Sequence, residues 1–255
     1  MTGDSEPPRP PGLAEDDAAE RARLYARHRG ALDGHPRTAP RTDGTVWLIR
    51  IGVVTVVLAV LGLRWWAAHP VPRRVDRRPI DVASDPVQDA VAGAKPIFWK
   101  HQSDHVTIYP LASYRIAARV VGTSRYRFGW QGSLVPWDVA LVWGRVADPD
   151  VLALVHFLQS DRWVHYMYSA TLPVDADYLV THISNNHWIP ATENVRRAIA
   201  HLSTGDRVDA QGYLVHAEHD GGGDWTSSLV RNDTGDGSCE LMYVRSLRVG
   251  ASVYE

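Results

Sequence analysis

Cysteine is nearly absent from this chain of 255 residues, which has only Cys239. A single cysteine excludes an intramolecular disulfide and any metal site that needs several cysteines. Lysine is almost as rare, because Lys95 and Lys100 are the only two and arginine supplies nearly all the positive charge. The formal net charge is −2, so no broad basic field is present and we do not expect a nucleic-acid-binding protein.

The common catalytic and cofactor motifs are missing as well. The sequence has no GxGxxG or P-loop glycine pattern, no HExxH zinc motif and no GxSxG serine motif. The glycine run Gly221–Gly223 lies between two strand-like segments, and it predicts a hairpin loop because no helix follows to receive a phosphate. We therefore expect no cofactor, and a protein that is not an enzyme is favoured.

One long hydrophobic run is present, "VWLIRIGVVTVVLAVLGLRWWA" from Val46 to Ala67. With its flanks the run reaches about the 20 residues that cross a hydrocarbon core. Trp47, Trp65 and Trp66 suit the aromatic belts at the two interfaces. The run lies far from the N-terminus, so we predict an uncleaved signal anchor over residues 45–68, embedded in the lipid bilayer, and not a cleaved signal peptide.

The orientation of this span depends on arginine counts. Four arginines precede it closely and four follow it, namely Arg27, Arg29, Arg37 and Arg41 against Arg73, Arg74, Arg77 and Arg78. Arg9, Arg21 and Arg23 lie further out on the N-terminal side, so the N-terminal side has more arginines in total and is expected to be cytoplasmic. The prediction is a single-pass protein of the cell membrane with a cytoplasmic N-terminus and an extracytoplasmic C-terminal domain.

Three further regions flank the span. Residues 1–44 are rich in proline and charge and predict a disordered tail, with a short helix possible over Asp16–His28. Residues 69–93 contain prolines and arginine pairs and predict an extended juxtamembrane linker, whose arginines could touch anionic headgroups. Residues 94–255 are long enough for one globular domain with a proper core.

Most of this domain has strand patterns of period two. The strand-like segments are "HVTIYPLASYRIAARVVGTSRYRF", "RWVHYMYSATL", "DYLVTHI", "DRVDAQGYLVHAE", "DWTSSLV" and "CELMYVRSLRV", with Gly212 expected at a bulge. The segment "WDVALVWG" fits either a strand or a short helix. The predicted fold class is α+β and β-rich, a small partly open β-barrel with one inserted helix, either OB-like or sortase-like.

The inserted helix is predicted over "TENVRRAIAHL". Thr192 suits the N-cap and Glu193 the first turn, while Val195, Ala198, Ile199 and Leu202 form one apolar stripe. The preceding stretch, "THISNNHWIPA", predicts a strand-to-helix corner with a tight turn at Asn185 and Asn186 and with Trp188 and Ile189 in the core. His182 and His187 are the polar rings on this corner and are the first candidates for a site.

Metal binding is one hypothesis for these histidines. His182 and His187 are five residues apart, and His216 would share one face of a strand with Glu218. Imidazole and carboxylate groups could hold zinc, although this spacing matches no specific template. A metal-dependent hydrolase that uses His182, His187 or His216 therefore stays open as an alternative.

Cys239 supports a second alternative, because a thiolate beside a histidine and an arginine is a nucleophile. Sortases are membrane-anchored transpeptidases with a catalytic histidine, cysteine and arginine. This chain resembles them in the order of its features along the sequence, which are the anchor, His187, Gly205-Asp206, Cys239 and Arg245 or Arg248. Ser238 stands where sortases have threonine, and Cys239 precedes a strand where theirs ends one. The resemblance implies an envelope cysteine enzyme in which His187 is the base, and by its chemistry His182 stays open as an alternative base for Cys239.

A second resemblance covers most of residues 105–244. The segments "PLASYRIAARV", "WDVALVWGRVADPDVL", "LQSDRW", "SNNHWIPA", "GDRVDAQGYLV" and "WTSSLVRNDTGDGSCELMYV" are together similar to a group of bacterial single-pass membrane proteins of unknown function. This resemblance implies an anchor and an extracytoplasmic domain, and it implies no catalytic residues. The first hypothesis is therefore a binding or assembly module of the cell envelope, with another envelope protein as a conceivable partner.

Overall fold

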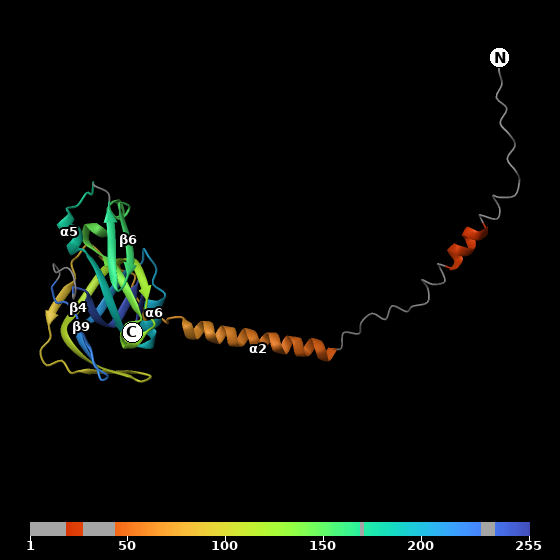
Figure 1. The fold of residues 1–255 in the computed structure, drawn as a ribbon, viewed down its shortest axis with the longest axis horizontal. Coiled ribbons are helices and arrows are strands. Elements are labelled where there is room, and N and C mark those ends of the chain that lie inside the picture. The colour runs from red at the N-terminus through yellow and green to blue at the C-terminus, as the bar shows by residue number, and fades with distance from the viewer. Residues whose placement is uncertain (1–18, 28–43, 169–170, 231–237) are drawn as a thin grey trace, which may run out of the picture. The chain divides into compact units, whose positions relative to one another are not determined.

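A computed structural model describes residues 19–27, 44–168, 171–230 and 238–255 of the chain (Figure 1). Most of the predicted disordered tail, residues 1–18 and 28–43, lies outside the described residues. Residues 19–27 are helical, inside the short helix expected over Asp16–His28. The chain divides into two units, residues 1–61 and 62–255, and each is described by itself.

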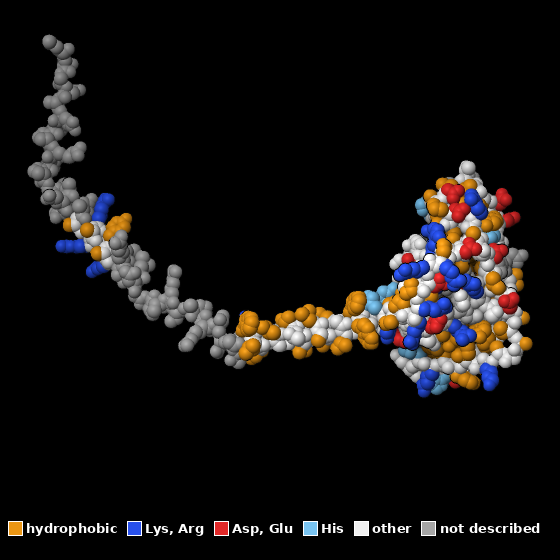
Figure 2. Space-filling model, turned by 180° about the vertical axis from the view of Figure 1, so that it is seen from behind, with side chains coloured by type: hydrophobic (Ala, Val, Ile, Leu, Met, Phe, Trp, Pro, Cys, Tyr) orange, Lys and Arg blue, Asp and Glu red, His pale blue; other side chains and the backbone are white. Residues whose placement is uncertain are grey.

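Helix α2 (Gly44–Ala68) contains the hydrophobic run. Its segment Trp47–Ala68 has 22 residues and is long and apolar enough to cross a membrane, and no part of it is buried by the protein. Figure 2 shows apolar side chains distributed along its length. The hydroxyl of Thr55 donates to the carbonyl of Ile51 at 2.9 Å, so this polar group is satisfied within the helix.

Five strands of the second unit pair in a closed ring. They are β4 (Asp104–Arg125), β5 (Trp137–Val142), β8 (Ile183–Pro190), β11 (Glu240–Val249) and β9 (Arg207–His219), each paired with the next and β9 with β4. The β8–β11 pair is parallel, and the other four pairs are antiparallel. Figure 1 shows β4 and β9 as long curved strands that run side by side.

Short strands extend this ring. They are β1 (Arg74–Val75) on β12 (Ser252–Tyr254), β12 on β11, β2 (Val87–Ala90) and β3 (Ile97–His101) on β4, and β10 (Asp224–Thr226) on β9. A separate hairpin of β6 (Val155–Ser160) and β7 (Trp163–Tyr168) is inserted between β5 and β8. The β-rich fold predicted from the strand patterns is therefore confirmed, and "WDVALVWG" is a strand, β5.

The connections contain short helices. These are α3 (Gly129–Leu134), a 3₁₀ turn at Gly144–Ala147, α4 (Pro149–Leu152), α5 (Ala176–Thr181) and α6 (Glu193–Ala200). The strand predicted over "DYLVTHI" is wrong, because α5 occupies most of it and buries only Leu179. In α6 the Thr192 side chain accepts a hydrogen bond from the Val195 N–H at 3.1 Å, so the predicted N-cap is confirmed.

The main hydrophobic core consists of alternate residues of the ring strands together with the apolar stripe of α6. Ile116, Ala118 and Val120 of β4 contribute to it, as do Val195 and Ile199 of α6. The predicted burial of Trp188 and Ile189 is confirmed, since both side chains are fully buried. Trp188 belongs to this core, while Ile189 points the other way into a second cluster with Leu134, Val135 and Leu241.

The turn predicted at Asn185 and Asn186 is wrong. Both residues lie inside β8, which is paired with β5 on one side and with β11 on the other. Their side chains bond groups other than the local backbone, Asn185 on the β6–β7 hairpin and Asn186 within β8, which removes the reason to form a turn. Asn185 bonds Gln159 and Arg162, and Asn186 donates to the hydroxyl of Ser184 at 3.1 Å.

The domain begins earlier than residue 94. The segment expected as a free linker, residues 69–93, contains β1 and β2 and buries Ile80. Its carbonyl at Val82 also accepts a hydrogen bond from the Gly144 N–H at 2.8 Å. The proline and arginine content predicted an extended chain. Two extended parts of this segment, β1 and β2, form edge strands of the sheet.

Gly212 is not itself bulged. The register shifts on the partner strand between Val244 and Ser246, so Arg245 is the extra residue. A Cβ atom at Gly212 would lie 1.8 Å from the carbonyl oxygen of Tyr243. The glycine is therefore required by the close approach of the β11 backbone at this bulge.

Candidate functional site

A buried charged cluster lies on the outer face of β5 and β8. Asp138 and His187 are direct cross-strand partners, and their neighbours Trp137, Val139 and Trp188 point into the core on the opposite face. The Asp138 carboxylate is fully buried, and it accepts a hydrogen bond from Nδ1 of His187 at 2.9 Å. Since the carboxylate is an acceptor, it favours the His187 tautomer with the proton on Nδ1.

Arg162 provides the third member of this cluster from the tip of the β6–β7 hairpin. Its Nη1 donates to Asp138 Oδ1 at 3.0 Å, and its guanidinium carbon lies 4.1 Å from the ring centre of Tyr126 and 4.9 Å from that of Trp225. Burial lowers the pKa of Arg162, and the charge of Asp138 opposes that shift. The tip is a tight turn, with φ of 50° at Asp161 and 64° at Arg162.

Cys239 and Asn185 reach the same point. The Asn185 amide donates to the Arg162 carbonyl at 2.8 Å, and the Cys239 thiol contacts that carbonyl at 3.9 Å. Cys239 is half-buried and directly precedes β11. Of the residues singled out from the sequence, Asn185 and Cys239 thus contact the Arg162 carbonyl, and His187 is linked to Arg162 through the Asp138 carboxylate. We call Asp138, Arg162, Asn185 and His187 the buried cluster.

The chemistry available to the buried cluster is that of an oriented imidazole. A carboxylate on Nδ1 leaves Nε2 of His187 as the basic nitrogen, and in the described part of the chain no hydrogen-bond partner is found for it. The same carboxylate also neutralises Arg162. The arrangement therefore fastens the hairpin to the ring, and it holds the His187 imidazole in the orientation that a general base needs.

The other predicted residues do not join this cluster. The His182 ring stacks on Tyr178 at 3.7 Å and lies 3.5 Å from an Asp85 oxygen. His216 is bonded to Thr226 at 2.7 Å and to Glu218 at 3.1 Å, on the shared strand face that the sequence predicted. Among the described residues no group of three or more histidine, cysteine, aspartate or glutamate side chains converges on a possible metal position.

Neither arginine of the sortase-like order is the one that contacts Cys239. Arg245 donates to the Tyr213 hydroxyl at 3.1 Å, on the other side of β9 and β11 from the core. Arg248 is buried, bonds the carbonyls of Gly250 and Arg78, and lies 3.3 Å from the Asp76 carboxylate. The guanidinium that accompanies His187 is that of Arg162.

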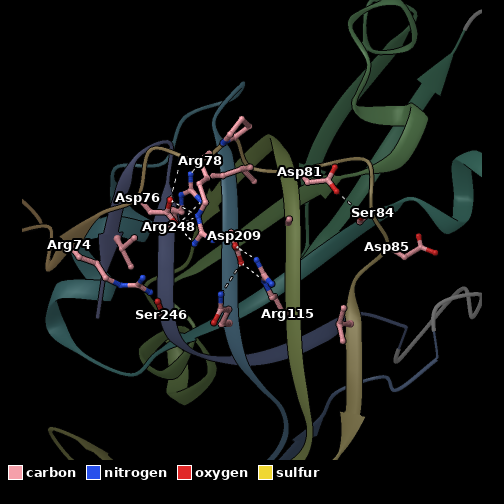
Figure 3. A pocket seen from close by; sticks show the side chains of 16 residues that line it. Arg74, Asp76, Arg78, Asp81, Ser84, Asp85, Arg115, Asp209, Ser246 and Arg248 are labelled. Atoms are coloured by element: carbon pink, nitrogen blue, oxygen red, sulfur yellow. Dashed lines mark hydrogen bonds and ion pairs between the residues drawn. The ribbon is translucent and has the colours of Figure 1, made fainter.

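Arg248 lines a cavity of about 540 Å³ between the segment before β2 and the strands β4, β9 and β11 (Figure 3). Its charges are largely paired, because Arg78 bonds Asp76 at 2.7 Å and Arg115 bonds Asp209 at 2.7 Å. The hydrogen bonds from Arg78 hold the pKa of Asp76 well below its usual range. Charges paired in this way leave little to attract a ligand, and Arg248 fastens the N-terminal segment to the sheet through Asp76 and the Arg78 carbonyl.

A second opening, of about 640 Å³, differs in its charge. It lies between the end of β3, the connection from β4 to β5 and the start of α6, and its charged groups are Arg125, Arg127, Arg196 and Glu193. Glu193 accepts hydrogen bonds from Arg196 at 2.5 Å, whereas no ion pair joins Arg125 or Arg127 to a carboxylate in the described residues. We call this opening the arginine groove.

Sequence reasoning missed Asp138, Arg162 and the groove arginines. Asp138 had a detectable signal, because a carboxylate inside the otherwise apolar run "WDVALVW" must find partners if the run is a buried strand. All six residues of β5 are buried. Arg162 and the groove arginines had no such signal, since their positions depend on the inserted hairpin and on the ends of the ring.

Figure 2 shows arginine and lysine side chains mixed with acidic ones on the face of the domain in view, which fits the near-neutral charge of the chain. That face therefore has no broad electrostatic field of one sign. Comparison of the chain with models of protein families, with curated proteins and with solved structures gives no match.

Proposed function

We propose that this chain is a single-pass membrane protein whose folded domain is a binding module of the cell envelope, held on the extracytoplasmic side. The observation that carries the proposal is the closed ring β4-β5-β8-β11-β9, with α6 between β8 and β9, on a chain that also has one apolar helix of membrane-spanning length. This strand order fits a five-stranded barrel of the OB type, a fold that serves mainly in ligand binding.

The arginine groove is the binding surface in this proposal. The outer face of β5 and β8 is occupied by the β6–β7 hairpin, whose Arg162 is bonded to Asp138. The cavity of Figure 3 has its arginines paired with carboxylates. The arginine groove combines cationic groups that lack such partners in the described residues with the rings of Trp99, Tyr126 and Trp137.

The anchor and its orientation are tested on the full chain in intact cells. Alkaline carbonate should leave the protein in the membrane pellet. In a Cys239→Ser background, Ala251→Cys should react with a membrane-impermeant maleimide and Ser5→Cys should not. Release by carbonate would refute the anchor, and the reverse labelling pattern would refute the orientation.

One observation favours a second candidate, an envelope cysteine enzyme. His187 and Arg162 both bond the Asp138 carboxylate, which orients His187 as a general base would be oriented, and the Cys239 thiol contacts the Arg162 carbonyl. In this candidate Cys239 is the nucleophile and His187 the base, with Arg162 in the position that the sequence assigned to Arg245 or Arg248.

The single cysteine makes the two candidates separable by alkylation. The rate at which iodoacetamide alkylates Cys239 at neutral pH is measured in the parent chain and in His187→Gln. A binding module predicts rates within about threefold, because an ordinary thiol with a pKa of about 8.5 needs no base partner. A fall of tenfold or more in His187→Gln, with the fold intact by circular dichroism, would support the enzyme instead.

A further inference from the structure

We propose that the arginine groove binds the phosphate-bearing headgroup of an anionic phospholipid of the bilayer that α2 crosses. The inference rests on the proposed function, and it adds the occupant of the groove. Three independent features of the domain carry it: the charge of the groove, the aromatic rings around it, and the short connection between α6 and the end of α2.

The charge of the groove selects an anion. Its lining has three arginines against one carboxylate, and Glu193 is shared by Arg196 and by Arg197, which bonds it at 3.1 Å. Arg125 and Arg127 are exposed and have no ion pair with another described residue. Guanidinium groups bind phosphate oxygens through pairs of hydrogen bonds, so two neighbouring free arginines suit a phosphodiester.

The rings around the groove suit the boundary between headgroups and acyl chains. Trp137 lies beneath two of the arginines, with guanidinium carbons 5.3 Å (Arg125) and 5.9 Å (Arg196) from its ring centre. Phe128 directly follows Arg127 and is 92 % exposed. An exposed phenyl ring beside cationic side chains is the combination found where protein surfaces rest on a bilayer interface.

The connection to α2 keeps the groove near the membrane. Only His69 and Pro70 separate Ala68, the last residue of α2, from Val71. The backbone of Val71 makes two hydrogen bonds of 2.8 Å with the Asn194 side chain, which belongs to α6. Three extended residues span about 10 Å at most. Because Glu193 and Arg196 of the same helix line the groove, the groove lies within reach of the headgroup layer.

The first test measures lipid binding to the full-length protein. The chain in detergent micelles is titrated with phosphatidylglycerol or with phosphatidylcholine of the same acyl chains, and bound lipids are quantified by native mass spectrometry. We expect tighter binding of phosphatidylglycerol. The double variant Arg125→Gln/Arg127→Gln should weaken it by about fivefold for each arginine removed and leave phosphatidylcholine binding unchanged.

The matched control is Arg73→Gln/Arg77→Gln. These arginines follow the span directly, are exposed, and have no ion pair with another described residue, so the control removes the same charge outside the groove. Its preference for phosphatidylglycerol should stay within about twofold of the parent. Equal losses of phosphatidylglycerol affinity in both double variants would show that only the general positive field of the protein attracts the lipid. No loss of affinity in the groove variant would place the lipid elsewhere. Either result overturns the proposal.

A second measurement locates the lipid and separates it from free phosphates. In nanodiscs, amide hydrogen exchange of residues 125–128 should be slower with phosphatidylglycerol than with phosphatidylcholine alone. Soluble glycerol phosphate should not displace the lipid at equal concentration; displacement would show that the groove takes free phosphates and would overturn the lipid assignment. A protein that stays in carbonate-washed membranes without lipid preference would refute this inference alone, whereas release by carbonate would refute the proposed function.

Discussion

The buried cluster and the arginine groove use the same residue types for different ends. Both combine arginine with aromatic rings and one carboxylate. In the buried cluster the carboxylate is fully buried and both His187 and Arg162 bond to it, so every charge is compensated inside the domain. In the arginine groove the Glu193 carboxylate accepts hydrogen bonds from Arg196 and Arg197. Arg125 and Arg127 remain exposed to solvent.

This difference separates stability from binding. A charged side chain that is already paired within the fold gains little by binding a ligand. Removing that side chain leaves its buried partner unpaired. An exposed, uncompensated arginine contributes little to folding, and its hydrogen-bonding groups are available to an anion. The two regions should therefore respond in opposite ways to the same kind of substitution.

The largest effect is expected for Asp138→Asn. The variant keeps one acceptor oxygen but loses the buried negative charge that compensates Arg162, so the free energy of unfolding should fall by about 3 to 5 kcal/mol. Denaturant unfolding of the full chain in micelles, followed by tryptophan fluorescence, measures this loss.

The control for this variant is Asp148→Asn, which removes a carboxylate whose partner Arg145 is about half exposed. Its cost should be below about 1 kcal/mol. If Asp138→Asn were no more costly than Asp148→Asn, the buried cluster would not stabilise the domain, and its residues would have to be explained by chemistry alone.

A smaller effect is expected for Arg162→Gln. The side chain is 19 % exposed, and loss of its charged hydrogen bond should cost about 2 kcal/mol. The effect should be local, because Arg162 fastens the tip of the β6–β7 hairpin to the ring. Hydrogen exchange should therefore speed up within residues 155–168 and remain unchanged in β4 and β9. Unchanged protection of the hairpin would contradict this role for Arg162.

Asp76 offers an intermediate case with a defined pH dependence. Hydrogen bonds from Arg78 lower the pKa of Asp76, so its carboxylate stabilises the fold when it is ionised. The stability gap between the parent and Asp76→Asn should be full above the ordinary aspartate pKa of 3.8, and it should shrink as the pH falls below that value. Unfolding measured from neutral to acid pH checks this sign; a gap that widens in acid would contradict it.

The sequence predicted the local elements of this fold better than its site. Helix α6 follows from its cap and apolar stripe, and the ring strands follow from alternation, because both patterns depend on neighbours a few residues apart. The segment "SNNH" failed for a physical reason. Asparagine favours turns when its side chain must bond its own backbone, but here Gln159 and Arg162 of the inserted hairpin bond Asn185, and Asn186 donates to the side chain of Ser184 in the same strand.

The same limit applies to the candidate residues. His187 and Cys239 were singled out because of their chemistry, and the structure places His187 on the carboxylate that Arg162 also bonds and Cys239 against the Arg162 carbonyl. His182, His216 and Arg245 were chosen on the same grounds and lie in unrelated contacts. What separates the two groups is the register of β5 on β8 and the position of an inserted hairpin, and neither is encoded by the spacing of the candidates themselves.

The smallest effect on folding is expected for the groove variant Arg125→Gln/Arg127→Gln. Both side chains are exposed and lack an ion pair with another described residue, so the free energy of unfolding should change by no more than about 0.5 kcal/mol. The measurement is the same denaturant unfolding that is applied to Asp138→Asn. A loss close to that of the buried variant would show that the groove arginines are part of the structural charge network, and the contrast between the two regions would fail. A stable double variant that no longer prefers anionic lipid would place binding, and not folding, at the groove.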